Sequence, residues 1–170
     1  FSAWGSADPK VKDRFTSDYQ SATDDRAVYK KYLPILGADA ILDYLEKENP
    51  LCHGVAHSLG AELYAQSKDL PESLQRCAHR CTGACMHGVV GEAFGMLNPR
   101  EITDKMEQVC QSGEMARLHK PGNCAHATGH ALMLSSDADL GWSLDACRQF
   151  KQPGMDYYCA TGVFMQYEMF

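Results

Sequence analysis

Histidines at helical spacing are the residues best suited to chemistry in this sequence. The chain contains seven histidines. His53 and His57 are four residues apart, and so are His126 and His130. Residues at positions i and i+4 share one face of a helix, so two imidazoles at this spacing can bind the same ion. Each pair therefore predicts part of a site for a transition metal, because such metals favour imidazole nitrogen.

A fifth histidine and one carboxylate occupy related positions. His87 follows Cys85 by two residues, as His126 follows Cys124. If the helices that carry these residues pack around a common centre, we expect one metal site with the ligands His53, His57, His87, His126 and His130. Glu92 lies on the His87 helix, near the position of the second histidine in the pairs. It would act as a general base beside metal-activated water, as a further ligand, or as a partner that fixes an imidazole tautomer. In the alternative, purely structural interpretation, the imidazoles only form hydrogen bonds near helix ends.

The histidines belong to a segment that recurs four times along the chain. Each copy begins with a cysteine, in steps of 33, 39 and 35 residues, at Cys52, Cys85, Cys124 and Cys159. Small residues follow the cysteine, then apolar residues at helical intervals, and an amphipathic segment precedes each copy. This period is typical of two short helices with their connections. We therefore predict an all-α fold of about four repeated helical hairpins in one domain over residues 23–170, behind a polar arm or linker over residues 1–22.

The eight cysteines fit disulfides placed by the same repeat. One cysteine falls near the end of the first helix of a hairpin and another opens its second helix, so a bond between them would close the turn. In the chain-entropy model such a bond is worth about 2–4 kcal/mol. Disulfides persist outside the cytosol, so we expect a secreted or periplasmic protein, or one in the lumen of the secretory pathway. The predicted pairs are Cys77–Cys85, Cys110–Cys124 and Cys147–Cys159, which leaves Cys52 for Cys81.

Glycines recur beside the histidines in segments that otherwise favour helix. Because a helical glycine costs about 0.5–1 kcal/mol, we expect these residues to let helices approach closely; room for a bound group is the alternative. They are Gly54, Gly60, Gly88, Gly91, Gly129 and Gly162. Helix starts are expected at Asp69, at Asn98 with Pro99, and near Ser136 and Asp137. Surface positions are expected for Glu62, His79 and His119.

Composition and absent motifs narrow the function. The net charge is −6 and no basic run occurs, so no nucleic-acid partner is expected. No run of about 18 apolar residues predicts a transmembrane span. The zinc-protease motif HExxH, the haem motif CxxCH, GxSxG, GxGxxG and the phosphate-binding loop are all absent from the sequence. The chain begins at Phe1 rather than at Met, so we expect a processed or excised product.

Three functions remain open, in order of preference. The first is a metalloenzyme in which copper, zinc or iron performs redox or metal-hydroxide chemistry on a small-molecule substrate. The second is a module without catalysis that binds or carries a metal ion or haem. The third is a disulfide-rich domain that binds a protein partner and no metal. An open coordination position would indicate catalysis, and a saturated one would indicate storage or structure.

Overall fold

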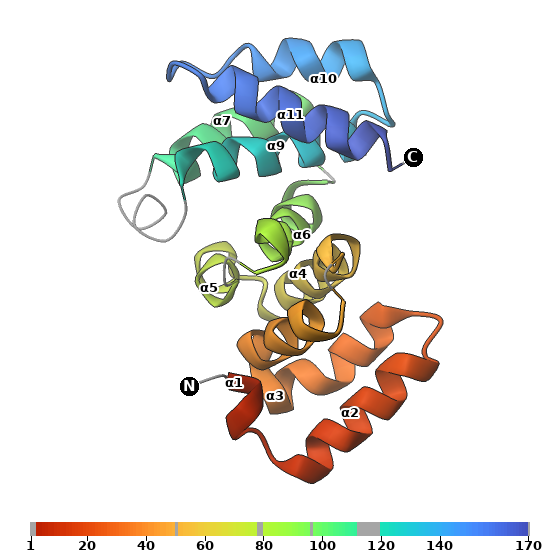
Figure 1. Cartoon of the computed structure of the whole chain (residues 1–170). Coiled ribbons are helices and arrows are strands. Elements are labelled where there is room, and N and C mark those ends of the chain that lie inside the picture. Colours follow the sequence, from red (N-terminus) through yellow and green to blue (C-terminus); the bar gives the residue numbers. More distant parts are fainter. Residues whose placement is uncertain (1–2, 50, 78–79, 96, 112–119, 170) are drawn as a thin grey trace. The chain divides into compact units, whose positions relative to one another are not determined.

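The chain is helical in a computed structural model, which describes residues 3–49, 51–77, 80–95, 97–111 and 120–169 (Figure 1). Within these residues the regular elements are all helices and none is a strand. The predicted all-α class is therefore confirmed. Contacts divide the chain into two compact units, which we call unit 1 (Phe1–Val89) and unit 2 (Val90–Phe170). The single domain over residues 23–170 stays a prediction.

Among the described residues, unit 1 contains five complete α-helices, a short 3₁₀ turn and the beginning of a sixth α-helix. Side-chain caps open several of them: the Asp8 carboxylate accepts a hydrogen bond at the start of α2, and the Asp24 carboxylate does so at the start of α3. Helix α3 is kinked at Gly37, whose φ of 76° lies in the left-handed region that favours glycine. The elements are α1 (Ala3–Ser6), α2 (Pro9–Ser21), α3 (Asp25–Glu48), α4 (His53–Ser67), α5 (Leu70–Arg76), η1 (Cys81–Gly83) and the beginning of α6 (Ala84–Phe94).

The segment over residues 1–22 differs from the polar arm expected there. Its helices α1 and α2 contribute to an aromatic cluster of unit 1, in which Phe15 is fully buried. The ring of Phe15 makes edge contacts at 5.2 Å with both Tyr32 and Tyr44, and the Trp4 ring lies 4.8 Å from Tyr44. The polar residues lie on the solvent-facing side of an amphipathic helix. Composition alone does not distinguish such a helix from a polar linker.

Unit 2 contains the end of α6 and four further described helices. Ile102 and Met106 of α7 are fully buried, as are Leu132 and Met133 of α9. These side chains belong to the core of unit 2, and α9 also carries His126 and His130. The helices are α7 (Pro99–Cys110), α9 (Pro121–Ser135), α10 (Leu140–Cys147) and α11 (Met155–Tyr167).

Glycines bring pairs of helices into backbone contact in both units. A Cβ built on Gly60 of α4 would collide with the carbonyl of Cys85 in α6, and one on Gly88 with the carbonyl of His57. In unit 2, Gly129 of α9 and Gly162 of α11 meet the carbonyls of Cys159 and His126 in the same way. The packing role predicted for these four glycines is confirmed. It does not extend to Gly54, which has no neighbour within 4 Å.

Four disulfides staple the helices, and the predicted pairing is confirmed in full. Unit 1 holds Cys52–Cys81 and Cys77–Cys85, and unit 2 holds Cys110–Cys124 and Cys147–Cys159. Each bond joins residues of a single unit. Four bonds in 170 residues suit a protein of an oxidising compartment. Among the described helices, none is both long and apolar enough to cross a membrane.

Serine contacts at the turns are repeated between the two units. The hydroxyl groups of Ser67 and Ser73 lie 2.6 Å apart at the turn between α4 and α5. Those of Ser136 and Ser143 lie 2.9 Å apart at the turn between α9 and α10. With the glycine contacts, this correspondence agrees with the predicted repeat of helical hairpins, which stays a prediction.

The predicted helix starts are correct at two places and wrong at the third. Asp69 caps α5 and Asn98 caps α7, each by accepting a backbone hydrogen bond. The start expected near Ser136 and Asp137 lies further on, because Asp137 and Ala138 are left-handed, with φ of 53° and 64°. They form the turn after α9, and Asp139 caps α10 instead.

Candidate metal centre

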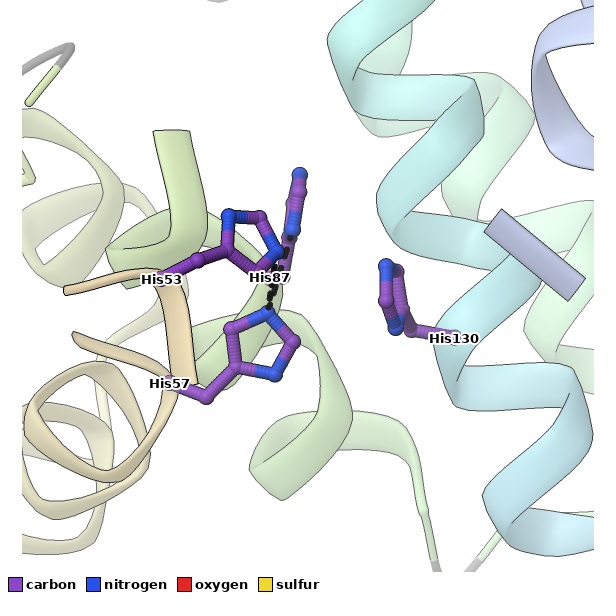
Figure 2. Close-up of side chains that lie close together, drawn as sticks. All are labelled: His53, His57, His87 and His130. Carbon is purple, nitrogen blue, oxygen red and sulfur yellow. Dashed lines mark hydrogen bonds between the residues drawn. The ribbon is translucent and has the colours of Figure 1, made fainter. Parts of the chain in front are cut away.

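Three histidines of unit 1 converge from α4 and α6 (Figure 2). His53 opens α4 and His57 lies one turn later, so both point from the same face. His87 lies in the first turns of α6. Because the neighbouring Gly88 has no side chain, the α6 backbone reaches the carbonyl of His57, and this close approach places the His87 ring against the other two.

The distances between the ring nitrogens are those expected of ligands of one ion. The Nε2 atoms of His53 and His57 lie 3.2 Å apart, and Nδ1 of His87 lies 3.3 Å from Nε2 of His57. All three rings offer a nitrogen within 4.8 Å of the others. Two nitrogens at about 2.0–2.1 Å from a tetrahedral zinc ion are about 3.3 Å apart. The cluster therefore has the spacing of a coordination site.

The loop of η1 fixes the orientation and the proton of His53. Nδ1 of His53 lies 3.2 Å from the carbonyl oxygen of Cys81, which can only accept a hydrogen bond, so Nδ1 carries the proton. The hydroxyl of Thr82 donates to the same carbonyl at 2.7 Å and accepts from Nδ1 as well. Nε2 of the neutral ring therefore presents its lone pair to His57. Such a contact behind a histidine is typical of metal ligands.

Two ring nitrogens face Nε2 of His57, namely Nε2 of His53 at 3.2 Å and Nδ1 of His87 at 3.3 Å. A neutral imidazole carries one proton and one lone pair, so each nitrogen of the group can act as a donor or as a ligand according to its tautomer. With its proton on Nδ1, as the Cys81 carbonyl favours, His53 contributes a lone pair to this group. The three nitrogens could therefore bind one cation together.

Burial favours the neutral form of His53. Desolvation lowers the pKa of His53, and the hydrogen bond to the Cys81 carbonyl opposes this effect in part. His87 is buried, with 5% of its surface exposed, whereas His53 and His57 are partly exposed. The His53 imidazole is therefore neutral near pH 7, which is the form that binds a metal.

Two further predicted ligands lie together in unit 2. The Nε2 atoms of His126 and His130 on α9 are 3.1 Å apart. Nδ1 of His126 lies 2.8 Å from the hydroxyl of Thr161, and Nδ1 of His130 lies 2.9 Å from Oε1 of Gln166, both on α11. Three of the five predicted ligands thus belong to unit 1 and two belong to unit 2. One centre made from all five stays a prediction.

Glu92, the predicted catalytic residue, is half-buried on α6. It follows His87 by five residues, which places the two side chains about 140° apart around the helix axis. Among the described residues, the group of nearby metal-ligating atoms that contains His87 does not include Glu92. Its role as a general base stays a prediction.

Glu62 is a correction to the sequence analysis, which expected it at the surface. Only 5% of its surface is exposed. Its carboxylate accepts hydrogen bonds of 3.0 Å from Arg26 on α3 and from Gln66 on α4. The face of α4 that carries Glu62 is turned toward α3, and the ion pair ties these helices together. His79 and His119 lie outside the described residues.

The sequence analysis did not identify the residues that form hydrogen bonds to the imidazole rings. Thr161 lies two residues after Cys159, as His87 lies two residues after Cys85. The sequence therefore assigns Thr161 to a ligand position of the repeat, but it does not indicate the hydrogen bond to His126. No sequence pattern identifies Thr82 or Gln166. The contact of Thr82 depends on the fold of η1, and that of Gln166 depends on the packing of α11 against α9.

Comparison with protein-family profiles, curated proteins and solved structures gave no match to this chain. Its function is therefore inferred from the site itself.

Proposed function

We propose that the protein is an extracytoplasmic metalloprotein that binds one transition-metal ion in unit 1 through His53, His57 and His87. The observation that carries the proposal is the pair of distances, 3.2 and 3.3 Å, between the three ring nitrogens. The proton fixed on Nδ1 of His53 supports it, because it turns the lone pair of Nε2 toward His57.

The donor set selects the class of metal. Three imidazole nitrogens suit zinc, copper and iron, whereas magnesium and calcium take oxygen ligands. Distances of 3.2 and 3.3 Å are close to the value of about 3.3 Å for tetrahedral zinc. We therefore expect zinc, copper or iron at the site, and a visible absorption spectrum distinguishes zinc, which has a filled d shell, from the other two.

Catalysis is the first candidate role. Three protein ligands leave a coordination position for water or substrate, as in catalytic zinc sites. His53 and His57 are partly exposed, so a small molecule can approach that position. The bound metal would supply Lewis-acid or redox chemistry to a small molecule at that position.

A metal-binding module without catalysis is the second candidate. The observation in its favour is that each unit carries its own group of neighbouring histidines. Such a pattern suits a protein that holds ions. X-ray absorption separates the two roles: three imidazoles with an exchangeable ligand indicate catalysis, and a full set of protein ligands indicates storage.

Metal analysis of the untagged protein, produced in an oxidising host, tests the proposal. We expect the double variant His53→Ala, His57→Ala to lose one equivalent of metal relative to the wild type, as measured by mass spectrometry. The control His119→Gln removes one imidazole outside the predicted ligand set and should keep the full metal content. Equal metal content in the wild type and the double variant would contradict the proposal.

A further inference from the structure

The histidine pair of unit 2 has a fixed arrangement of protons. The hydroxyl of Thr161 donates to the carbonyl of Tyr158 at 2.6 Å, so its oxygen accepts from Nδ1 of His126 at 2.8 Å. Oε1 of Gln166 accepts from Nδ1 of His130 at 2.9 Å. Both protons of the two neutral rings are therefore held on Nδ1, on the side away from the partner ring.

The two Nε2 atoms consequently present lone pairs to each other at 3.1 Å. Two lone pairs at this distance repel unless a positive charge lies between them. Nitrogens about 2.0–2.1 Å from a shared ion, and 3.1 Å from each other, subtend an angle of about 98° at the metal. This angle lies between the values for tetragonal and tetrahedral coordination, so it suits two neighbouring ligands of one divalent ion.

Buried polar side chains and a close backbone contact surround the histidine pair. His130 and Gln166 are buried, with 1% and 7% of their surfaces exposed. The glycines Gly129 and Gly162 bring the backbones of α9 and α11 together, and this contact places the polar groups of α11 behind the imidazoles. Oxygen acceptors behind metal-binding histidines fix the ring orientation and raise the basicity of the ligand nitrogen.

We propose that unit 2 carries a second binding site for a divalent transition-metal ion, formed by Nε2 of His126 and Nε2 of His130 and positioned by Thr161 and Gln166. This site goes beyond the proposed site of unit 1 and does not depend on it. Thr161 occupies the place that His87 holds in unit 1, two residues after a cysteine and directly before a glycine. Among the described residues of unit 2, the counterpart of His87 is therefore a threonine, and we expect the pair to bind the ion more weakly than the site of unit 1.

Zinc titration of the full disulfide-bonded chain tests the inference. We expect two equivalents of Zn²⁺ for the wild type by isothermal calorimetry, with the weaker one lost in the variant His126→Ala, His130→Ala. The variant His53→Ala, His57→Ala should keep the weaker equivalent and lose the tighter one. Near-UV circular dichroism of each variant checks that the fold is kept.

Each failure has its own pattern. Two equivalents in the His126→Ala, His130→Ala variant, or none in the His53→Ala, His57→Ala variant, would overturn the second site. No zinc in the His126→Ala, His130→Ala variant would instead refute the proposed site of unit 1.

A milder variant tests the site without removing a ligand. Thr161→Val deletes the acceptor behind His126 and should weaken the second equivalent about 10–100-fold, as is usual for such partners. Phe164→Leu, on the same helix and half exposed, is the control and should bind both equivalents normally. Unchanged affinity in Thr161→Val would overturn the positioning role. If ¹⁵N NMR shows only a proton shared between His126 and His130 at saturating zinc, the metal site itself is refuted.

Discussion

The close contact between α4 and α6 leads to a sharp prediction for Gly60→Ala. The added Cβ would meet three backbone atoms of α6: the carbonyl oxygen and carbon of Cys85 and the amide nitrogen of Val89. Backbone atoms move less easily than the ends of side chains, so the helices must separate. The same movement shifts His87 away from His57, whose nitrogens now lie 3.3 Å apart.

The magnitude follows from two opposing effects. Overpacking a close contact costs about 1–3 kcal/mol, with backbone neighbours near the upper limit. Replacing glycine by alanine inside a helix gains about 1 kcal/mol. We therefore expect Gly60→Ala to lower the free energy of unfolding by about 2 kcal/mol. Gly54→Ala lies on the same helix, where the added Cβ has no neighbour within 4 Å, and we expect it to be neutral or slightly stabilising.

Urea denaturation with the disulfides intact, followed by circular dichroism, measures the difference. With a slope of about 2 kcal/mol per molar urea, the midpoint of Gly60→Ala should fall by about 1 M. Zinc affinity should fall with it, while Gly54→Ala keeps both values. Equal midpoints for the two variants would refute the conclusion that backbone contact sets the distance between these helices.

Three further predictions concern bonds, protons and metal. The double variant Cys52→Ser, Cys81→Ser removes a disulfide between residues 29 positions apart. In the chain-entropy model this change should lower the free energy of unfolding by about 3–4 kcal/mol, as measured by urea denaturation. An unchanged free energy of unfolding would contradict this prediction. Hydrogen bonds from Lys31 and Tyr32 lower the pKa of Asp18 from 3.8. The unfolded chain thus binds this proton more readily, and the stabilisation present above about pH 4 is lost as the pH falls through the folded-state pKa. Asp18→Asn should flatten the acid side of the stability curve, and an unchanged curve would argue against this role. Finally, a chelator should lower the melting temperature of the wild type, since an ion at 100 times its Kd stabilises the fold by about 2.7 kcal/mol; an identical curve without metal would exclude tight binding.

The sequence predicted those features that depend on short-range order along the chain. The pairing of eight cysteines followed from their repeated places at helix ends, and each bond joins residues no more than 29 positions apart. The grouping of His53 with His57, and of His126 with His130, followed from the helical period alone. Backbone contact at the glycines followed from the cost of placing glycine in a helix.

Features that depend on which faces meet were not predicted. Phe15 is buried by aromatic rings of α3, and nothing within residues 1–22 indicates those partners. Glu62 resembles a surface carboxylate until α3 brings Arg26 to it. One partner of His130 is Gln166, which lies 36 residues further along the chain. Side-chain contacts of this range depend on the packing of whole helices.

The order of the cysteines along the chain has a consequence for oxidative folding. In unit 2 every cysteine pairs with the next one in the sequence, so bonds formed as the chain emerges from N- to C-terminus are native bonds. In unit 1 the pairs interleave: Cys77 emerges before Cys81, the partner of Cys52. Oxidation strictly in order of emergence would first join Cys52 to Cys77, and thiol–disulfide exchange would have to correct that bond. We therefore expect the maturation of unit 1, and with it the orientation of His53 by the Cys81 carbonyl, to respond more strongly to a disulfide isomerase than that of unit 2.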